Sequence, residues 1–500
     1  MTTHADQLSP PEILAKFEAD ADVAVGREFV ALAADYFAQT RNREGRVSTS
    51  HRPAELAARF DEPAPLVGVS IDSIIARIRA DVIPDCNHLH HPRYAGHQVA
   101  GPLPAAVWME SVTAAMNQSV AIFEMSPVGT VLEHRVVAWM CELAGFGKGS
   151  GGTFTSGGTE ATFTALLAAR GAAMPNAWND GVGSNPPVLL CGEHAHYAVT
   201  RAGAQLGIGM RNVLPIRSRN YKMDPGALRE ALEDLARDGR RVIAVVATAG
   251  STATGSFDDL EAIAAICDAH DVWLHVDAAH GGSALLSPTH RHRLAGIERA
   301  RSIAWDPHKG MLMPAQAGML LVRDEHDLDS AFSQRAPYLF PDSTEERVWD
   351  QGTRSFMCSR RAEVFKLWVA FQRYGVNGFA ELYDYFCALT RTMWEEIAER
   401  DDFEAMHAPE SNILCFRYVG PSRLTGSLPA NDEALDQLNR ELRERYNLSG
   451  HGWITGTNLD GRRVLRVTMM NPRTTASDVR DILDQLAELA RPVYSTHDTF

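Results

Sequence analysis

The sequence lacks the features that define several protein classes. None of its apolar runs reaches the roughly 18 residues that a membrane-spanning helix needs. The N-terminal stretch MTTHADQLSPPEILAKFEAD carries acidic residues and no apolar core of signal-peptide length, so we expect no secretion signal. The 7 cysteines include no CxxC pair, which favours reduced thiols in a cytoplasmic protein over a disulfide framework.

Basic residues are outnumbered by acidic ones. The chain has 48 basic and 63 acidic residues and a formal net charge of -15, which argues against nucleic acid or an anionic membrane as the main partner. The histidine clusters at 88–91 and 290–292 have no i, i+4 spacing with a third ligand in view, so we expect no metal site. At 500 residues and 45% hydrophobic, the chain is long enough for more than one soluble domain.

The middle of the chain alternates between strand and helix patterns. Short apolar strand candidates occur at 187–191, 241–248, 272–276 and 317–322, separated by helical segments. This alternation predicts an α/β fold with a mostly parallel sheet that is covered on both faces. Before these strands, the pattern from Ala105 to Gly145 predicts a long helix.

The two ends of the chain have different patterns. The last hundred or so residues hold strand candidates at 412–419 and 463–470 and a terminal helix, which predicts a small α+β domain. The N-terminal segment predicts amphipathic helices that cannot bury their apolar faces alone, so we expect them to pack on a partner subunit. The expected domains are an N-terminal arm at 1–100, a large domain at 101–385 and a small domain at 386–500.

Lys309 lies in the segment SIAWDPHKGMLMP, at 302–314, where a backbone bend can push an amine into a pocket. A lone lysine is most often a solvated surface residue. However, Asp277 ends the apolar strand candidate that comes before Lys309, in VWLHVDAAHGG. A pyridoxal phosphate site needs this pair, because the lysine forms a Schiff base and the carboxylate keeps the pyridine nitrogen protonated.

Two further features precede this pair. The segment GGTFTSGGTEATFTALLAAR places Gly158 and Thr159 at a helix start, where free N–H groups and the helix dipole favour a phosphate. His196 follows the first strand candidate, where it can stack on a cofactor ring. Each feature alone is weak. They occur in the order phosphate loop, stacking histidine, aspartate and lysine. This order favours a shared cofactor site over an ordinary structural role for each residue alone.

The segment from LHVDAAHGG to AWDPHK, together with HPRYAGHQ, QRAPYLF and CSRRAEVFKLWVAFQRYG, resembles the group II pyridoxal-phosphate-dependent decarboxylases. The likeness is closest to the branch of glutamate and cysteine-sulfinate decarboxylases, and it runs from about His91 to the C-terminus. It implies the aspartate-aminotransferase type of fold (fold type I) and an obligate homodimer with its active sites at the interface.

The resemblance also implies roles for single residues. It identifies Lys309, His196 and Asp277 as catalytic and Gln98 and Arg466 as substrate-binding, with Arg466 on the α-carboxylate. The cofactor-binding positions fall on Gly158 and Thr159 at the phosphate, His196 stacked on the ring, Thr252 beside it, Asp277 at the ring nitrogen, Ala279 under the ring, and Asp306, His308 and Lys309.

The chain departs from this family in three places. Asp306 stands where the family usually has asparagine, and His280 stands where the animal branch has tryptophan. The third departure is in a loop that normally carries a tyrosine, which returns a proton to Cα after CO2 leaves; residues 341–354 contain no tyrosine. Loss of that tyrosine in related enzymes goes with oxidative deamination to an aldehyde.

The leading hypothesis is an L-amino acid α-decarboxylase that acts on glutamate, aspartate or cysteine sulfinate. An aldehyde-forming decarboxylating oxidase, an aminotransferase and a non-catalytic protein that kept the fold are the alternatives. Aromatic amino acids and diaminobutyrate stay open as substrates, because Ala100, His97 and His280 replace pocket neighbours of the animal branch.

Overall fold

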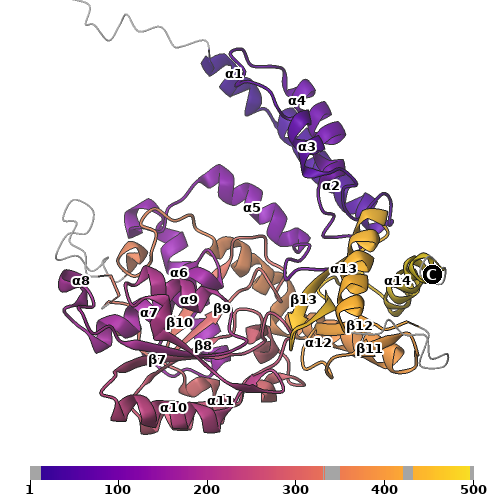
Figure 1. The fold of residues 1–500 in the computed structure, drawn as a ribbon. Helices are drawn as coiled ribbons and strands as arrows, with labels where there is room; N and C mark the ends of the chain where they lie inside the picture. Colours follow the sequence, from indigo (N-terminus) through magenta and orange to yellow (C-terminus); the bar gives the residue numbers. More distant parts are fainter. Residues whose placement is uncertain (1–12, 330, 333–348, 421–431, 496–500) are drawn as a thin grey trace, which may run out of the picture.

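The computed structural model describes residues 13–329, 331–332, 349–420 and 432–495. Figure 1 shows a large α/β part, a smaller part built on a second sheet, and a helical arm that projects away from both. Among the described residues, no helix is both long enough and apolar enough to cross a membrane.

The large part is built on a sheet of seven strands in the order β2-β10-β9-β8-β7-β3-β4. Strand β10 is antiparallel to both of its neighbours, and the other neighbouring strands pair in parallel. The central strands are buried along nearly their whole length, as expected for a sheet that is covered on both faces. The strands are β2 (Gly151–Thr155), β3 (Val188–Gly192), β4 (Val213–Ile216), β7 (Val242–Thr248), β8 (Trp273–Asp277), β9 (Ser302–Trp305) and β10 (Gly318–Val322).

Helices cover both faces of this sheet (Figure 1). Helices α7 and α9 pack on one face and α10 and α11 on the other, through separate groups of buried apolar side chains. The helices of this part are α5 (Pro104–Met116), α6 (Pro127–Ala144), α7 (Gly158–Ala173), α8 (Ala177–Asp180), α9 (Ala198–Gln205), α10 (Pro225–Arg237) and α11 (Leu260–Ala269), and a hairpin is formed by β5 (Ser218–Arg219) and β6 (Lys222–Met223).

The smaller part has a sheet of five strands in the order β1-β13-β14-β12-β11. Helix α12 (Val364–Ala398) contributes apolar side chains to the cores of both parts, so the expected domain limit at 385/386 falls inside a helix and stays a prediction. The remaining elements here are β1 (Tyr94–Ala95), β11 (Phe403–Ala405), β12 (Ile413–Tyr418), β13 (Trp453–Leu459), β14 (Arg462–Thr468), α13 (Asp432–Ser449) and α14 (Ala476–Ser495).

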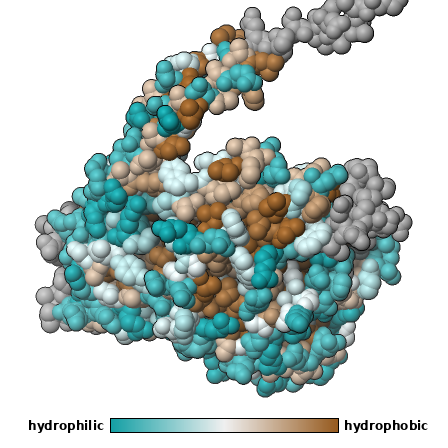
Figure 2. Space-filling view, turned by 180° about the vertical axis from the view of Figure 1, so that it is seen from behind, coloured by the Kyte–Doolittle hydropathy of each residue, from teal (hydrophilic) through white to brown (hydrophobic). Residues whose placement is uncertain are grey.

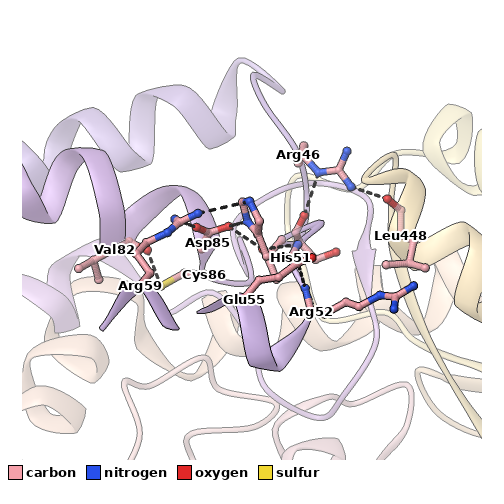
Figure 3. A network of polar contacts seen from close by, with 11 residues as sticks. Arg46, His51, Arg52, Glu55, Arg59, Val82, Asp85, Cys86 and Leu448 are labelled. Carbon is pink, nitrogen blue, oxygen red and sulfur yellow. Dashed lines mark hydrogen bonds and ion pairs between the residues drawn. The ribbon is translucent and has the colours of Figure 1, made fainter. Parts of the chain in front are cut away.

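The arm consists of α1 (Ile13–Asp20), α2 (Val23–Arg41), α3 (Pro53–Arg59) and α4 (Ile71–Arg77). It joins the body where the Val47 N–H donates to the Gly450 carbonyl over 2.9 Å and the Ser48 hydroxyl donates to the Asn447 carbonyl over 3.0 Å. Figure 3 shows the polar network beside this joint, in which Arg46 reaches Leu448 and Asp85 lies between His51 and Arg59.

The predicted strands at 187–191, 241–248, 272–276 and 317–322 agree with β3, β7, β8 and β10 to within one residue at each end. The single long helix from Ala105 to Gly145 was wrong. Asn117 has φ 46 and ends α5 in the left-handed region, and Pro127 begins α6. Proline fits the first turn of a helix, so this proline marks a start and not a continuation.

Candidate active site

A cavity of about 310 Å³ lies at the carboxyl ends of the large sheet's strands. Its walls come from the loops that follow β2, β3, β7, β8 and β9, which all end at this edge. Ligand sites of open α/β sheets form at this edge. The lining residues are Ser156, Gly157, Gly158, Thr159, His196, Thr248, Gly250, Thr252, Asp277, Ala279, His280, Asp306, His308 and Lys309.

Lys309 follows β9 and points its amine at a carboxylate. Its Nζ lies 3.0 Å from Oδ2 of Asp306, and Nε2 of His308 lies 3.5 Å from the same oxygen. The other ring nitrogen of His308, Nδ1, accepts the Ala317 N–H over 3.0 Å, so the proton of the neutral ring is on Nε2, facing Asp306. Three neighbouring residues thus place an amine, a ring N–H and a carboxylate in one corner.

The start of α7 forms the opposite wall. A Cβ on Gly158 would lie 2.7 Å from Cβ of Ala279, so the backbone can come this close only at a glycine. Glu160 turns back to accept the Ser156 N–H over 2.9 Å. The first N–H groups of a helix have no partner within it, and together with the helix dipole they make this wall suitable for an anion.

Asp277 is the last residue of β8, and His196 lies in the loop after β3. Burial raises the pKa of the Asp277 carboxyl, while Lys309, the Ala279 N–H and His196 act to lower it. Burial lowers the pKa of His196, whose Nδ1 accepts the Ala198 N–H over 3.3 Å. His196 is therefore a neutral ring with its proton on Nε2.

His280 ties the cavity to the smaller sheet. Its Nε2 lies 2.8 Å from Oδ1 of Asn412, whose amide nitrogen donates to the Met469 carbonyl over 2.9 Å. The amide oxygen of Asn412 can only accept, so Nε2 of His280 is the donor. Burial lowers the pKa of His280 to about 3, and Lys309 adds to this effect.

Two predicted site residues do not line the cavity. Arg466, on β14, donates from Nη1 to the carbonyl of Thr252 over 2.6 Å and from Nε to the hydroxyl of Thr455 over 3.1 Å. It therefore lies directly behind a lining residue. Gln98 lies just after β1, and its Nε2 is buried without a hydrogen-bond partner.

All other predicted site residues meet in the cavity: Gly158, Thr159, His196, Thr252, Asp277, Ala279, Asp306, His308 and Lys309. Sequence reasoning missed Thr248 and Gly250. Their signal is the segment ATAGST, at 247–252, which spans the end of the strand candidate at 241–248, the position at which the other strands carry site residues. Of the loop at 341–354, residues 341–348 lie outside the described residues.

The described residues contain no group of three or more His, Cys, Asp or Glu side chains that could hold a metal ion.

This chain is similar to known proteins of one family. Residues 53–419 match the pyridoxal-dependent decarboxylase conserved domain. Acidic amino acid decarboxylase of Xenopus tropicalis is 35% identical over 80% of this chain and 80% of its own length. Cysteine sulfinic acid decarboxylase of Rattus norvegicus is 34% identical over 90% of this chain and 92% of its own. The crystal structure of mouse CSAD superposes with a TM-score of 0.88 at 32% identity, covering 94% of this chain and 99% of that one.

Proposed function

Because the chain belongs to the pyridoxal-dependent decarboxylase family and is a pyridoxal-phosphate-dependent carboxy-lyase, we propose that its substrate is a small acidic L-amino acid. Glutamate, aspartate and cysteine sulfinate are the candidates, and the products are CO2 and an amine. The relatives named for acidic amino acids and cysteine sulfinic acid support this substrate class. The observation that carries the proposed chemistry is the meeting of Lys309, Asp277 and the start of α7 in one cavity.

The phosphate end of the cofactor fits the start of α7. Because Gly158 has no Cβ, the backbone of the first turn can lie close to Ala279 and Asp306, and its free N–H groups suit an anion. We assign Gly158 and Thr159 to the phosphate. Helix α7 packs against the strands whose ends carry the other residues that we assign to the cofactor (Figure 1).

The ring end fits the groups that follow β3, β7, β8 and β9. When bound, pyridoxal phosphate supplies a sink for the electron pair that remains at Cα as CO2 leaves. Asp277 would hold a negative charge beside the ring nitrogen, and a positive charge there would offset the burial that raises the pKa of its carboxyl. Lys309 would offer the amine that binds the aldehyde carbon, and His196 and Ala279 would lie against the ring.

The substrate end is assigned to Arg466 and Gln98. Arg466 is held rigidly by Thr252 and Thr455, so its guanidinium is preorganised for the α-carboxylate. Gln98 has a buried amide nitrogen that lacks a partner, and a substrate oxygen would satisfy it.

We further propose that the chain works as a homodimer in the cytoplasm. Large apolar side chains are exposed on α5 and α6, including Trp108, Val112, Met116, Val128 and Val131, and a second group is exposed on α1. Figure 2 shows apolar surface on the body on the side that the arm overhangs. A second copy that covers the arm and α5 would bury these side chains. All 7 cysteines are free, which fits a reducing compartment.

The test is to incubate the purified yellow protein with a panel of L-amino acids and to follow CO2, amine, peroxide and ammonia together. We expect CO2 and amine in equal amounts from one acidic substrate. Lys309→Ala should abolish both products, and Lys148→Ala, which changes an exposed lysine, should leave them unchanged. Aldehyde and peroxide alongside CO2 would instead support the oxidase hypothesis that the tyrosine-free loop suggests.

A further inference from the structure

Asp306 stands between the two halves of the cofactor cavity. Its Oδ2 lies 3.0 Å from Nζ of Lys309, and a Cβ built on Gly158 would lie 3.2 Å from the same oxygen. The carboxylate is therefore close both to the amine that takes the aldehyde and to the helix start assigned to the phosphate. One side chain borders both ends of the site.

The carboxylate of Asp306 has few polar partners. The residue is 1% exposed, and Oδ1 is buried without a hydrogen bond. Besides Lys309, the charged or titratable groups that act with it are His308, His196, His280 and Asp277. Burial keeps the three histidine rings neutral by lowering each pKa. Lys309 is thus the cation that balances Asp306 in this corner.

This balance changes when the cofactor arrives. The Lys309 amine would then form a C=N bond with the aldehyde, with loss of water, and its nitrogen would stay cationic while protonated. The phosphate, with about two negative charges, would add a new anion at the start of α7. Like charges repel strongly in a buried site, where water screens them little. An uncharged side chain of the same shape would not oppose the phosphate.

We propose that Asp306 weakens the hold of this protein on phosphate-bearing cofactor, pairing with Lys309 in the empty site and opposing the phosphate in the filled one. This inference rests on the phosphate position proposed above. It makes Asp306 a residue that sets cofactor affinity, so the fraction of loaded enzyme responds to the concentration of pyridoxal phosphate.

The experiment compares apo-protein of the wild type with Asp306→Asn, which keeps the shape and removes the charge. The dissociation constants of pyridoxal phosphate and of pyridoxal, which lacks the phosphate, are measured from the visible absorbance band. Inorganic phosphate is then added as a competitor. Asp180→Asn, an exposed aspartate with the same substitution, is the matched control.

We expect Asp306→Asn to raise the ratio of the pyridoxal constant to the pyridoxal phosphate constant by about tenfold or more, with tighter binding of inorganic phosphate. Any gain common to both aldehydes reports the release of Lys309 and cancels in the ratio. Asp180→Asn should leave the ratio unchanged.

A ratio that stays constant or falls overturns the inference. If Asp306→Asn does not fold, Asp306→Ala replaces it; if neither folds, the carboxylate serves the fold and the inference fails. Failure of the wild type to form a visible band with either aldehyde would count against the proposed cofactor site itself, which separates the two outcomes.

Discussion

The pKa of a carboxyl group in the body, Asp258, and that of one in the arm, Asp85, are shifted in opposite directions. In the body, Asp258 is buried and accepts the N–H groups of Met223 and Thr248, each over 2.7 Å, and burial raises its pKa to about 6. In the arm, Asp85 accepts from Thr49 over 2.6 Å and lies 2.8 Å from His51, and these hydrogen bonds lower its pKa to about 2 (Figure 3). Desolvation dominates at Asp258, and hydrogen-bond partners dominate at Asp85.

This comparison predicts that removing one member of a buried ion pair in the body lowers the free energy of unfolding more than removing an exposed pair in the arm. The largest effect is expected for Arg360→Met, because Glu133 and Arg360 pair with side chains that are 0% and 3% exposed. Removing one member leaves a buried charge unpaired, which costs roughly 3–5 kcal/mol. Urea denaturation should show this loss in the free energy of unfolding.

The double variant Glu133→Met/Arg360→Met should recover much of the loss, because it buries no charge. A loss under about 1 kcal/mol for the single variant would contradict this prediction, because the buried pair would then contribute no more to stability than the exposed pairs of the arm.

The second prediction concerns chemistry at the body's sheet edge. Asp277→Ala removes the negative charge assigned to the ring nitrogen, and kcat should fall by about 10²- to 10³-fold, the range for losing one preorganised electrostatic group. Cofactor absorbance should shift in the same variant. Asp85→Ala should leave kcat unchanged, since Asp85 lies in the arm network (Figure 3). Equal losses in both variants would contradict the assignment.

How much of the site could be predicted depended on whether a signal was local. Asp277 and Lys309 were predicted because Asp277 ends an apolar strand and Lys309 comes shortly after one, and strand ends are visible in sequence. Gly250 was missed because its role depends on packing: a Cβ there would lie 2.6 Å from the nitrogen of Gly281, which begins a short 3-10 helix later in the chain.

The same limit applies to the fold. The break between α5 and α6 was missed because Asn117 adopts a left-handed conformation that many asparagines do not adopt. The position of Arg466 behind Thr252 depends on how the small sheet packs on the large part, and no pattern within either segment encodes that.

The third prediction uses the raised pKa of Asp258. Its folded pKa of about 6 exceeds the value of 3.8 for a free carboxyl, so its contribution to stability is greatest below about pH 4 and is lost as pH rises through 6. Between pH 5 and 7.5 the wild type should lose roughly 1 kcal/mol relative to Asp258→Asn, which does not titrate. The two melting temperatures, measured across this range, test it. A difference that stays constant with pH would mean that Asp258 is ionised throughout.

The smallest effect is expected in the arm. Asp85→Ala removes the pairs with His51 and Arg59, whose side chains are 40% and 34% exposed. Exposed pairs contribute about 0–1 kcal/mol, so global unfolding should hardly change.

The visible effect of Asp85→Ala should be local, as faster protease cleavage between α3 and α4.

The contribution of Asp85 to stability changes with pH in the opposite direction to that of Asp258. Because the folded pKa lies below 3.8, the contribution of Asp85 is present above about pH 4 and is lost as pH falls toward 2. In the wild type, acid should therefore speed cleavage of the arm, with an acid-tolerant protease as the probe, and in Asp85→Ala it should add little. If Asp85→Ala destabilised the whole chain as much as Arg360→Met, the arm would be part of the core's cooperative unit, and the contrast between the two regions would fail.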